Sequence, residues 1–324
     1  MMRAQIIGTG SCLPEQTASN HFLSTLVDTS DEWIQSRTGI RQRHIVSAEE
    51  ENTVSMAVEA ARRAIQDAEV ETEEIDLILV ATCSADTLVP STACCVQHAL
   101  GASKAVAFDI NAACSGFVFA LGLADTYFQA GTYQTALIIG VETLSRLVDW
   151  GDRSSCILFG DGAGAVVASA CERGMIAMTQ GSDGTGKDAL AVKSRGIQNP
   201  FLSSGTETDY LHMKGPEVFQ FAVKTVPQSI RATLDRAGLS PADVDLYFLH
   251  QANARINRHI AKRLKVPEDR FPHNIERCGN TSAASIPILL DETNRAGQIP
   301  SGARVVLAGF GAGLTWGSCV LTWK

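Results

Sequence analysis

The sequence predicts an α/β fold, and two observations carry this prediction. Apolar runs typical of buried strands alternate with helical patterns, and the order of these signals recurs in the second half of the chain. The chain has 324 residues, of which 45% are hydrophobic and 19% charged, so it can bury a substantial core. We expect one large body made of two fused halves, residues 1–172 and 173–324.

Near-continuous apolar runs rich in β-branched residues predict the strands, because a strand of a parallel sheet is buried on both faces. These runs are residues 75–82, 136–141, 244–249 and 304–309. Between them, apolar side chains recur at helical spacing. In the first half these are Val58, Ala61, Ile65 and Ala68, and in the second half Ile256, Ile260 and Leu264.

The second half of the chain repeats the order of the first. Residues 73–80 (EEIDLILV) resemble residues 242–249 (ADVDLYFL). Cys114 follows Ile75 by 39 positions and Asn280 follows Val244 by 36, so the spacing pairs Cys114 with Asn280. Diverged copies of one unit would bring corresponding loops together at a shared centre. We therefore expect Cys114, His250 and Asn280, all at strand-to-helix junctions, to meet there.

Charge and composition exclude several classes of function. The net charge of −8 repels phosphate backbones and acidic lipid headgroups, so neither nucleic acid nor a membrane is an expected partner. The uncharged apolar stretch of residues 110–124 is shorter than the roughly 20 residues of a membrane span. The nine cysteines lack a C-x-x-C pair, which predicts neither disulfides nor zinc and indicates a reducing cytoplasm.

Glycine-rich segments give no sign of a nucleotide cofactor. Residues 309–317 (GFGAGLTWG) lack the G-x-G-x-x-G spacing and a following acidic residue, but their backbone N–H groups could face a developing oxyanion. We interpret residues 159–164 (FGDGAG) as a tight turn with close backbone packing.

Cys114 is the candidate nucleophile. It lies in residues 111–117 (NAACSGF), between an apolar strand and a long apolar helix, with small residues on both sides. A helix N-terminus presents unpaired N–H groups and a positive dipole end, which would lower the pKa of the thiol. An inert buried cysteine is the alternative, and the small neighbours, which permit close approach to the sulfur, favour the reactive one.

Two further segments supply polar side chains. Residues 249–253 (LHQAN) place His250 and Asn253 just beyond a buried strand, although a satisfied core histidine is an equally good interpretation. Residues 279–285 (GNTSAAS) place Asn280 at the start of a helix, where a simple capping asparagine is the alternative.

These four segments, in this order and over the full length, resemble the β-ketoacyl-acyl carrier protein synthase III family. Residues 29–40 (TSDEWIQSRTGI) are also similar to that family, and locally their Thr-x-x-Glu pattern predicts a capping box at Thr29. The resemblance implies a thiolase-like, five-layered α-β-α-β-α fold with two pseudo-duplicated halves. It also implies a homodimer.

The resemblance further implies a two-step acyl transfer. Cys114 would take the acyl group of an acyl-CoA, acetyl-CoA by default, while the backbone N–H groups of Cys114 and Ala312 hold the oxyanion. His250 and Asn280 would then bind the thioester oxygen of malonyl-acyl carrier protein as CO₂ leaves. Ala312 stands where the family has glycine. Acyl-CoA is a substrate in this scheme, and no resident cofactor or metal is expected.

Family binding residues match positions along the whole chain. The resemblance implies that Trp33 and Arg153 sandwich the CoA adenine and that Arg37 contacts its phosphates. Asn253 and Gly215 match contacts to pantetheine. The family often has asparagine at the position of Pro216, so one CoA contact is expected to be missing here.

Carrier-protein docking and primer choice are the remaining expectations. Arg255, Arg258 and Lys262 recur at helical spacing and form a basic stripe suited to an acidic carrier protein, with a generic solvated face as the alternative. The resemblance places Val89 against the partner subunit's acyl pocket, which Phe310 also lines. Since relatives have an aromatic residue at the position of Val89, we expect longer or branched primers to fit.

Three other functions stay open at this point. One is a CoA-dependent acyltransferase or ketosynthase of secondary metabolism with a non-acetyl primer. Another is a Cys-His-Asn hydrolase, because papain-like proteases use the same three residue types. The third is a non-catalytic module that binds a carrier protein, in which Cys114 would be inert.

Overall fold

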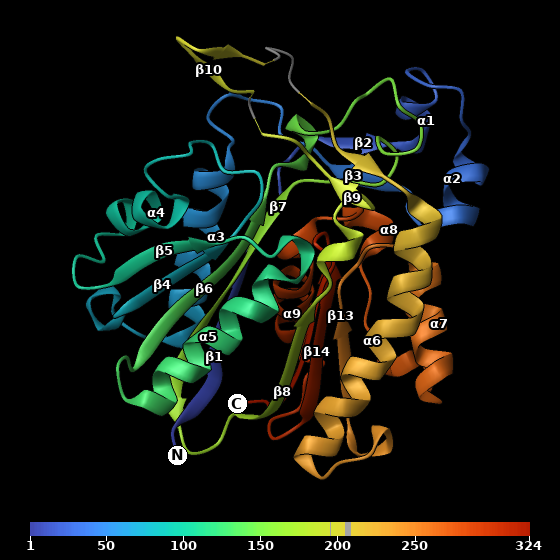
Figure 1. Ribbon diagram of the computed structural model, residues 1–324. Helices are drawn as coiled ribbons and strands as arrows, with labels where there is room; N and C mark the ends of the chain where they lie inside the picture. The colour runs from blue at the N-terminus through green and yellow to red at the C-terminus, as the bar shows by residue number, and fades with distance from the viewer. Residues whose placement is uncertain (195, 205–208) are drawn as a thin grey trace.

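The computed structural model describes residues 1–194, 196–204 and 209–324, and they form five layers (Figure 1). Two sheets face each other across a pair of inner helices, and each sheet carries outer helices on its other face. The inner helices are α5 (Gly116–Ala130) and α9 (Ser285–Arg295). The outer helices are α3 (Thr53–Ala68) and α4 (Thr92–Leu100) on the first sheet and α6 (Gly215–Ala237) and α7 (Ala254–Leu264) on the second.

The first sheet has the strand order β1-β7-β6-β4-β5. Strand β4 pairs in parallel with β5 and β6, whereas β7 is antiparallel to both β6 and β1. All five residues of β4 are buried, as expected for a strand covered on both faces. The strands are β1 (Arg3–Cys12), β4 (Leu77–Ala81), β5 (Val106–Ile110), β6 (Thr135–Glu142) and β7 (Gly162–Cys171).

The second sheet repeats this arrangement with the order β13-β14-β15-β8. Strand β13 is parallel to β14, and β15 is antiparallel to both β14 and β8, so β13, β14, β15 and β8 correspond to β4, β6, β7 and β1. The predicted internal duplication is therefore confirmed. The strands are β8 (Met175–Ser182), β13 (Leu246–Leu249), β14 (Arg304–Gly311) and β15 (Thr315–Thr322).

The inner helices show which residues correspond between the halves. Each begins after a short 3₁₀ turn, η2 (Ala113–Ser115) before α5 and η7 (Ser282–Ala284) before α9. Both turns start with a left-handed residue, Ala113 at φ 47° and Ser282 at φ 48°. Cys114 therefore corresponds to Ala283, and the pairing of Cys114 with Asn280 suggested by sequence spacing is corrected.

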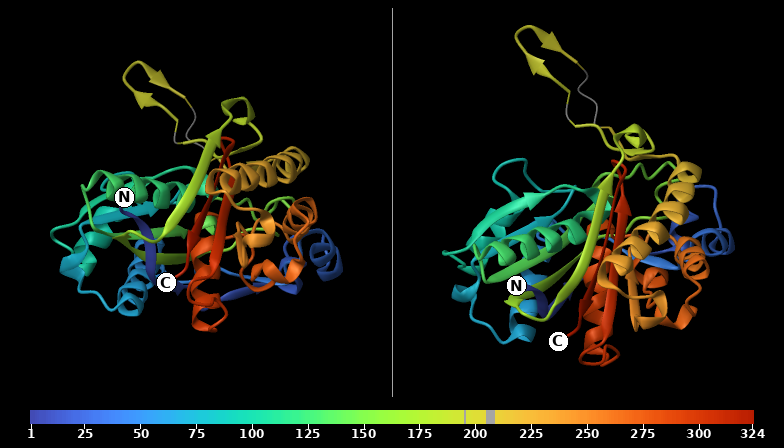
Figure 2. Two further views of the ribbon diagram at one scale, coloured as in Figure 1. Left: turned by 90° about the horizontal axis from the view of Figure 1, so that it is seen from below. Right: turned by 60° about the horizontal axis from the view of Figure 1, so that its bottom comes forward.

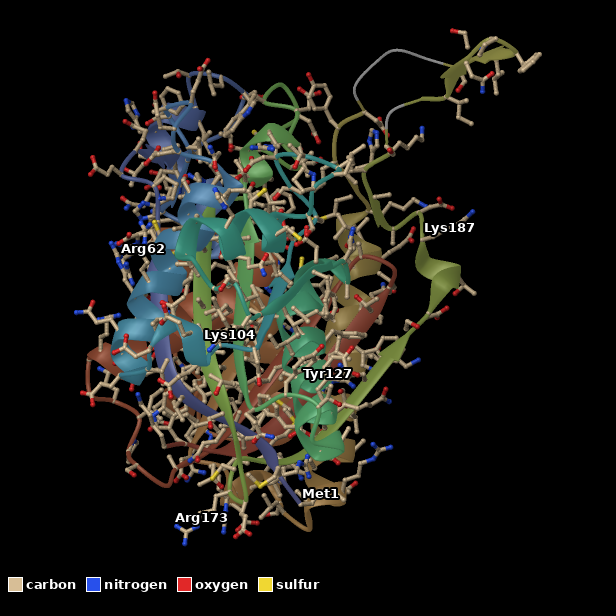
Figure 3. The ribbon with its side chains drawn as sticks, turned by 90° about the vertical axis from the view of Figure 1, so that its left-hand side faces the viewer. Met1, Arg62, Lys104, Tyr127, Arg173 and Lys187 are labelled. Carbon is tan, nitrogen blue, oxygen red and sulfur yellow. The ribbon has the colours of Figure 1, made fainter. Side chains whose placement is uncertain are left out.

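The helical patterns of the sequence pack as expected. Along α3, Val58, Ala61 and Ile65 are buried against the first sheet, while Arg62 projects from the opposite side into solvent (Figure 3). Along α7, Ile256, Ile260 and Leu264 are buried against the second sheet. Both helices thus turn an apolar stripe to the core and a charged face outward.

Two local predictions are wrong. The helix α2 (Asp31–Thr38) begins one residue later than expected, because Ser30, not Thr29, is the N-cap and accepts a hydrogen bond from the backbone N–H of Trp33. Residues 162–164 are not a turn but the start of β7. The close packing expected there does occur: a Cβ on Gly164 would lie 2.5 Å from the backbone nitrogen of Ile288.

Smaller elements connect the main strands and helices. Within the described ranges, a hairpin made by β10 and β11 projects from the body (Figure 2). The small strands are β2 (Thr17–Ser19), β3 (Gln42–His44), β9 (Leu190–Ala191), β10 (Gln198–Asn199), β11 (Leu202–Ser203) and β12 (His212–Met213). The small helices are α1 (Asn20–Leu23), α8 (Ile275–Cys278), η1 (Thr72–Glu74), η3 (Leu144–Arg146), η4 (Gly184–Gly186), η5 (Pro241–Asp243) and η6 (Glu268–Arg270).

Two further expectations concern the chain as a whole. The nine cysteines all fall in described parts of the chain and carry free thiols. In those same parts, no helix combines the length and the hydropathy that crossing a bilayer requires.

Candidate active site

Cys114 sits in η2, at the point where β5 gives way to the inner helix α5. Its side chain is buried, and the neighbouring strand β14 lies directly against it. A Cβ on Gly311 would approach the backbone nitrogen of Cys114 to 2.7 Å and its Cβ to 3.0 Å, so only glycine fits there. The glycines of residues 309–317 therefore allow the end of β14 to touch the nucleophile.

The thiol of Cys114 does not have the lowered pKa that the helix start led us to expect. Burial raises its pKa to about 12, opposed by a hydrogen bond from Ser282 and reinforced by the nearby Glu142 carboxylate. Desolvation of a thiolate in this enclosed position outweighs the favourable helix dipole. At neutral pH the thiol is protonated, and its attack on a carbonyl needs a proton acceptor.

His250 directly follows β13 and is also buried. Its Nδ1 lies 2.7 Å from the hydroxyl oxygen of Ser285 on α9, and its ring packs edge-on against Phe310 with centroids 5.2 Å apart. Burial lowers the pKa of His250 to about 3, so the imidazole is neutral at physiological pH. A neutral ring held at Nδ1 can present Nε2 as a proton acceptor or, in the other tautomer, as a donor.

Asn280 is fixed by its backbone as well as by its side chain. Its N–H donates to the carbonyl of Leu158, and its carbonyl accepts from the N–H of Gly160. Its Oδ1 accepts a hydrogen bond of 2.9 Å from the backbone N–H of Ser282. The N-cap residue of η7 is Thr281, so Asn280 is not the capping asparagine of the alternative interpretation. The bond to its Oδ1 leaves its Nδ2 group for other partners.

The three predicted catalytic residues line one cavity of about 100 Å³. This cavity, here called the channel, also touches Gly215, Asn253, Phe310 and Gly311, which the sequence had picked out separately. The juxtaposition of Cys114, His250 and Asn280 expected from the sequence therefore occurs. Phe310, which we expected to line the acyl pocket, lines the channel instead and packs against His250.

A second cavity, of about 270 Å³, opens on the other side of Cys114. We call it the apolar pocket. Cys114 lies at the junction of channel and pocket, and Ala312 borders the pocket beside it. Most of the other lining side chains are apolar, and they include Leu144, Leu147, Phe159, Leu190 and Leu211.

Of the residues matched to CoA, Asn253 and Gly215 line the channel, and Arg37 contacts Asn253. Asn253 is the N-cap of α7: its Oδ1 accepts from the N–H of Arg255, and its Nδ2 donates to the carbonyl of Arg37. The guanidinium carbon of Arg153 lies 5.0 Å from the centroid of the Trp33 ring. These two side chains therefore stack on each other in the free protein.

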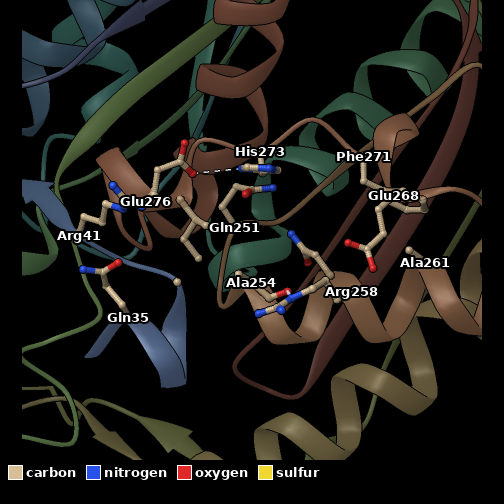
Figure 4. A pocket seen from close by; sticks show the side chains of 13 residues that line it. Gln35, Arg41, Gln251, Ala254, Arg258, Ala261, Glu268, Phe271, His273 and Glu276 are labelled. Atoms are coloured by element: carbon tan, nitrogen blue, oxygen red, sulfur yellow. Dashed lines mark hydrogen bonds and ion pairs between the residues drawn. The ribbon is translucent and has the colours of Figure 1, made fainter. Parts of the chain in front are cut away.

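The basic stripe on α7 is present but divided. Arg255 lies over the ring of Phe219, a residue of the channel, at 5.6 Å from its centroid, while Lys262 points to solvent. Arg258 instead borders a separate surface cavity of about 630 Å³, with Glu268 and Arg41 among its other charged residues (Figure 4). Arg255 is thus the member of the stripe nearest to the channel.

Val89 lines neither cavity of its own chain. It is 84% exposed, beside Leu88, which is 91% exposed. Any contact of Val89 with an acyl group must therefore come from a second subunit.

Three residues that hold the site together were missed by the sequence analysis. Ser285 fixes His250, and Ser282 fixes Asn280 while donating its hydroxyl to the buried carboxylate of Glu142. Ser282 and Ser285 stood inside a motif that we had interpreted as a plain helix start. Glu142 offered one usable signal, a charged residue closing the apolar run of residues 136–141.

Comparisons with known proteins agree with this geometry. Residues 108–184 match the family described as 3-oxoacyl-[acyl-carrier-protein (ACP)] synthase III, and residues 234–323 match its C-terminal family. A β-ketoacyl-[acyl-carrier-protein] synthase III of Clostridium acetobutylicum is 49% identical over 325 residues, covering 100% of this chain and 99% of that protein.

Solved structures show the same relationship. The crystal structure of 3-oxoacyl-[acyl-carrier-protein] synthase III from Aquifex aeolicus matches with a TM-score of 0.92 and 42% identity, over 99% of this chain and 100% of that chain. A priming β-ketosynthase of the R1128 polyketide pathway matches with a TM-score of 0.93 and 36% identity, over 99% and 96% of the two chains. The chain therefore belongs to the β-ketoacyl-acyl carrier protein synthase III family of condensing acyltransferases.

Proposed function

We propose that this protein is the initiating condensing enzyme of type II fatty acid synthesis. It transfers the acyl group of an acyl-CoA to Cys114 and then condenses it with malonyl-acyl carrier protein. The products are a 3-oxoacyl-acyl carrier protein, CO₂ and CoA. The observation that carries this proposal is the position of the Cys114 thiol between a channel bordered by polar groups and an apolar pocket.

In the first half-reaction, Cys114 attacks the thioester carbonyl. Because the thiol is protonated, its proton passes to Nε2 of His250 as the C–S bond forms. The Ser285 hydroxyl supports this step. Its own proton is donated to the carbonyl of Ser282, at 2.8 Å, so its oxygen can accept a hydrogen bond from Nδ1–H of His250. In this tautomer Nε2 carries no proton and can accept one. The N–H groups of Cys114 and Ala312 hold the oxyanion, and CoA leaves as a thiol with the proton from His250.

In the second half-reaction, His250 acts as a donor. When the Ser285 hydroxyl turns to donate to Nδ1, the neutral ring carries its proton on Nε2. Nε2–H and the Nδ2 group of Asn280 then donate to the thioester oxygen of the malonyl group, which stabilises the enolate left by loss of CO₂. The enolate carbon attacks the acyl-cysteine, and the released Cys114 sulfur takes up a proton from water.

The surroundings of Cys114 suit the two substrates. The apolar pocket takes the acyl chain, and the channel past Asn253 and Gly215 takes a pantetheine arm. Trp33, Arg37 and Arg153 bind the nucleotide part of CoA, and Arg255 with Arg258 and Lys262 docks the acidic carrier protein. Thiol, imidazole, amide and backbone N–H groups supply all the chemistry of the scheme, so no resident cofactor or metal is required.

We infer that the working form is a homodimer. Strand β5 lies at the edge of the first sheet, and Val106 at its start is partly exposed, which leaves an edge for pairing with a second copy. The exposed Leu88 and Val89 precede α4 on the same side of that sheet. Nine free thiols suit a reducing compartment, and the cytoplasm is the compartment we propose.

The hydrolase alternative fits the geometry less well. In a Cys-His-Asn hydrolase the asparagine orients the histidine. Here Ser285, not Asn280, holds Nδ1 of His250, and the Oδ1 of Asn280 is occupied by the N–H of Ser282. Asn280 is therefore better placed as a donor to substrate than as a support for the imidazole.

Intact-protein mass spectrometry tests the proposal. The protein is incubated with acyl-CoAs of increasing length, without malonyl-carrier protein, beside a Cys114→Ala control. We expect a mass increase of one acyl group that is absent from the control, and conversion to the 3-oxoacyl product when malonyl-carrier protein is added. Absence of labelling with every CoA would exclude the CoA-primed reaction.

The same panel separates fatty acid synthesis from secondary metabolism. The likeness to a polyketide priming ketosynthase and the small Val89 side chain both favour a primer other than acetyl. Fastest labelling by acetyl-CoA supports the default primer. Labelling only by longer or branched acyl-CoAs supports the alternative.

A further inference from the structure

Glu142, the last residue of β6, is a fully buried carboxylate close to the nucleophile that the reaction scheme does not use. It accepts hydrogen bonds from the hydroxyl of Ser84 at 2.5 Å, the backbone N–H of Cys83 at 3.1 Å and the hydroxyl of Ser282 at 3.0 Å. The Ser84 hydroxyl itself accepts from the N–H of Thr143, so its own proton points to Glu142. These donors favour the ionised carboxylate and oppose the burial that raises its pKa.

Ser282 connects this carboxylate to Asn280. The hydroxyl of Ser282 donates to Glu142, and its backbone N–H donates to Oδ1 of Asn280 at 2.9 Å. Ser282 has a left-handed backbone, φ 48°, which a residue with a side chain adopts only when its surroundings hold it there. The hydrogen bond to Glu142 is one contact that stabilises this backbone conformation. In this conformation the Oδ1 of Asn280 accepts from Ser282, and its Nδ2 group can donate to a substrate.

The same residue also reaches His250. The carbonyl of Ser282 lies 2.8 Å from the Ser285 hydroxyl, which is the partner of Nδ1 of His250. Displacement of Ser282 would therefore act on Asn280 directly, and on His250 only through the Ser285 hydroxyl. Cys114 is held by other contacts, since Gly311 packs on its backbone and α5 begins immediately after it.

We propose that Glu142 is a positioning residue for decarboxylation and condensation, acting through Ser282 on Asn280, which takes part only in the malonyl half-reaction. It does not border the channel or the apolar pocket, so it has no direct contact with substrate. This inference rests on the proposed function. It predicts that loss of Glu142 impairs the malonyl half-reaction far more than acyl transfer to Cys114.

The test compares the two half-reactions in Glu142→Gln, which keeps the shape but replaces one acceptor oxygen by a donor. We expect the rate of condensation to fall by about 10²-fold, as for other small misplacements of reacting groups, with little change in the rate of Cys114 acylation by acetyl-CoA. KM for malonyl-carrier protein should change little, because docking is remote from Glu142. Equal loss in both half-reactions, or condensation at the wild-type rate, would overturn the proposal.

Two more variants separate positioning from general destabilisation. Ser282→Ala removes the hydroxyl that bonds Glu142 and the Cys114 thiol, and it should also impair condensation more than acylation, even where Glu142→Gln folds poorly. Asp291→Asn is the matched control: Asp291 is a buried carboxylate of α9 that accepts from the hydroxyls of Thr9 and Ser11. It should leave the ratio of the two rates at the wild-type value.

Alkylation of Cys114 by iodoacetamide adds a readout that does not depend on the proposed function. Peptide mapping after alkylation at a series of pH values gives the midpoint for Cys114 alone. Since the Glu142 charge raises the pKa of that thiol, Glu142→Gln should move the midpoint to lower pH. Failure of the wild-type protein to condense acyl groups would contradict the proposed function. An alkylation midpoint of Cys114 that is the same in wild type and Glu142→Gln would show that Glu142 carries no charge beside Cys114, and would contradict the role inferred for Glu142.

Discussion

The hydroxyl oxygen of Ser285 lies 2.7 Å from Nδ1 of His250, so a serine on the inner helix α9 sets the orientation of the catalytic imidazole. Both side chains are buried, and the ring is held from a second direction by Phe310. The hydroxyl can donate to Nδ1 or accept from it, and the two half-reactions require opposite choices. Ser285 therefore serves both tautomers of His250.

Ser285→Ala should impair both half-reactions and destabilise the protein. Loss of the hydroxyl leaves Nδ1 of His250 without its buried partner, which costs about 1 to 3 kcal/mol of unfolding free energy. We expect the rates of acylation and condensation each to fall by about 10- to 10²-fold, within the range of general acid–base contributions. Mass spectrometry of reactions quenched at a series of times measures the two rates, and denaturant unfolding measures the loss of stability. Ser285→Thr, which restores a hydroxyl, should recover part of both losses.

The lowered pKa of His250 predicts how stability depends on pH. The folded protein keeps His250 neutral down to about pH 3, whereas an unfolded histidine takes up a proton near pH 6.5. The unfolded state thus binds more protons below pH 6.5, and stability is lost as pH falls through that range. The contribution of His250 amounts to about 2 kcal/mol between pH 7.5 and 5.

A comparison with His250→Gln isolates this contribution. Buried carboxyls such as Glu142 and Asp161, whose pKa values are raised by burial, titrate in both proteins and cancel in the difference. Urea unfolding at several pH values should show the free-energy gap between wild type and variant narrowing as pH falls. A constant gap from pH 7.5 to 5 would mean that His250 is not held neutral by the fold.

Much of this architecture could be predicted from the sequence because its signals are local. Continuous apolar runs predicted β4, β6, β13 and β14, and their recurrence predicted the duplication. Strands β7 and β15 were not predicted, since glycines and small residues interrupt their apolar patterns. Those glycines have a tertiary cause: a Cβ at Gly164 of β7 would lie 2.5 Å from the backbone nitrogen of Ile288 in α9, and a Cβ at Gly317 of β15 would lie 3.2 Å from the Val118 side chain in α5.

The candidate site was likewise predicted only in part. Cys114, His250 and Asn280 stood in recognisable motifs, whereas the links through Ser282, Ser285 and Glu142 join residues far apart in the chain. The thiol pKa was also beyond local reasoning. The helix start that favours a thiolate is visible in the sequence, but the burial that opposes it arises only when β14 and η7 close over Cys114.

The stacked pair Trp33 and Arg153 predicts a rearrangement on CoA binding. Their separation of 5.0 Å is too small for a base between them, because two van der Waals contacts need about 7 Å. Arg153 must therefore swing away and give up its hydrogen bond to the carbonyl of Asp28. We expect CoA to change tryptophan fluorescence in the wild type but not in Trp33→Phe, and Trp33→Ala to raise KM for acyl-CoA about tenfold, as loss of one good stacking contact would. Equal fluorescence changes in wild type and Trp33→Phe would contradict this.

Arg255 should be the principal charge for docking the carrier protein. It stacks on Phe219 at the channel, whereas Arg258 turns to another cavity and Lys262 lies farther along α7. Arg255→Ala should raise KM for malonyl-carrier protein about tenfold with little change in kcat or in acylation by acetyl-CoA, a loss typical of one charged hot-spot contact. The matched control is Arg62→Ala, which removes an exposed arginine of α3 on the other sheet. Equal KM values for the two variants would contradict docking on α7.

Val89 should determine primer length across the dimer. In its own subunit it is exposed and touches neither cavity, so its influence on the acyl group depends on insertion into the partner's apolar pocket. Val89→Phe would add an aromatic ring there and occupy space otherwise available to the primer. We expect labelling of Cys114 by acetyl-CoA to be kept and labelling by longer or branched acyl-CoAs to fall by about 10- to 10²-fold, the discrimination that a few methylene groups provide.

Leu88→Phe, which adds the same ring to the neighbouring exposed position, is the control and should leave the length preference unchanged. If Val89→Phe accepts long primers as well as the wild type does, the primer is selected within one subunit, and the residues lining the apolar pocket around Leu211 become the determinants to test.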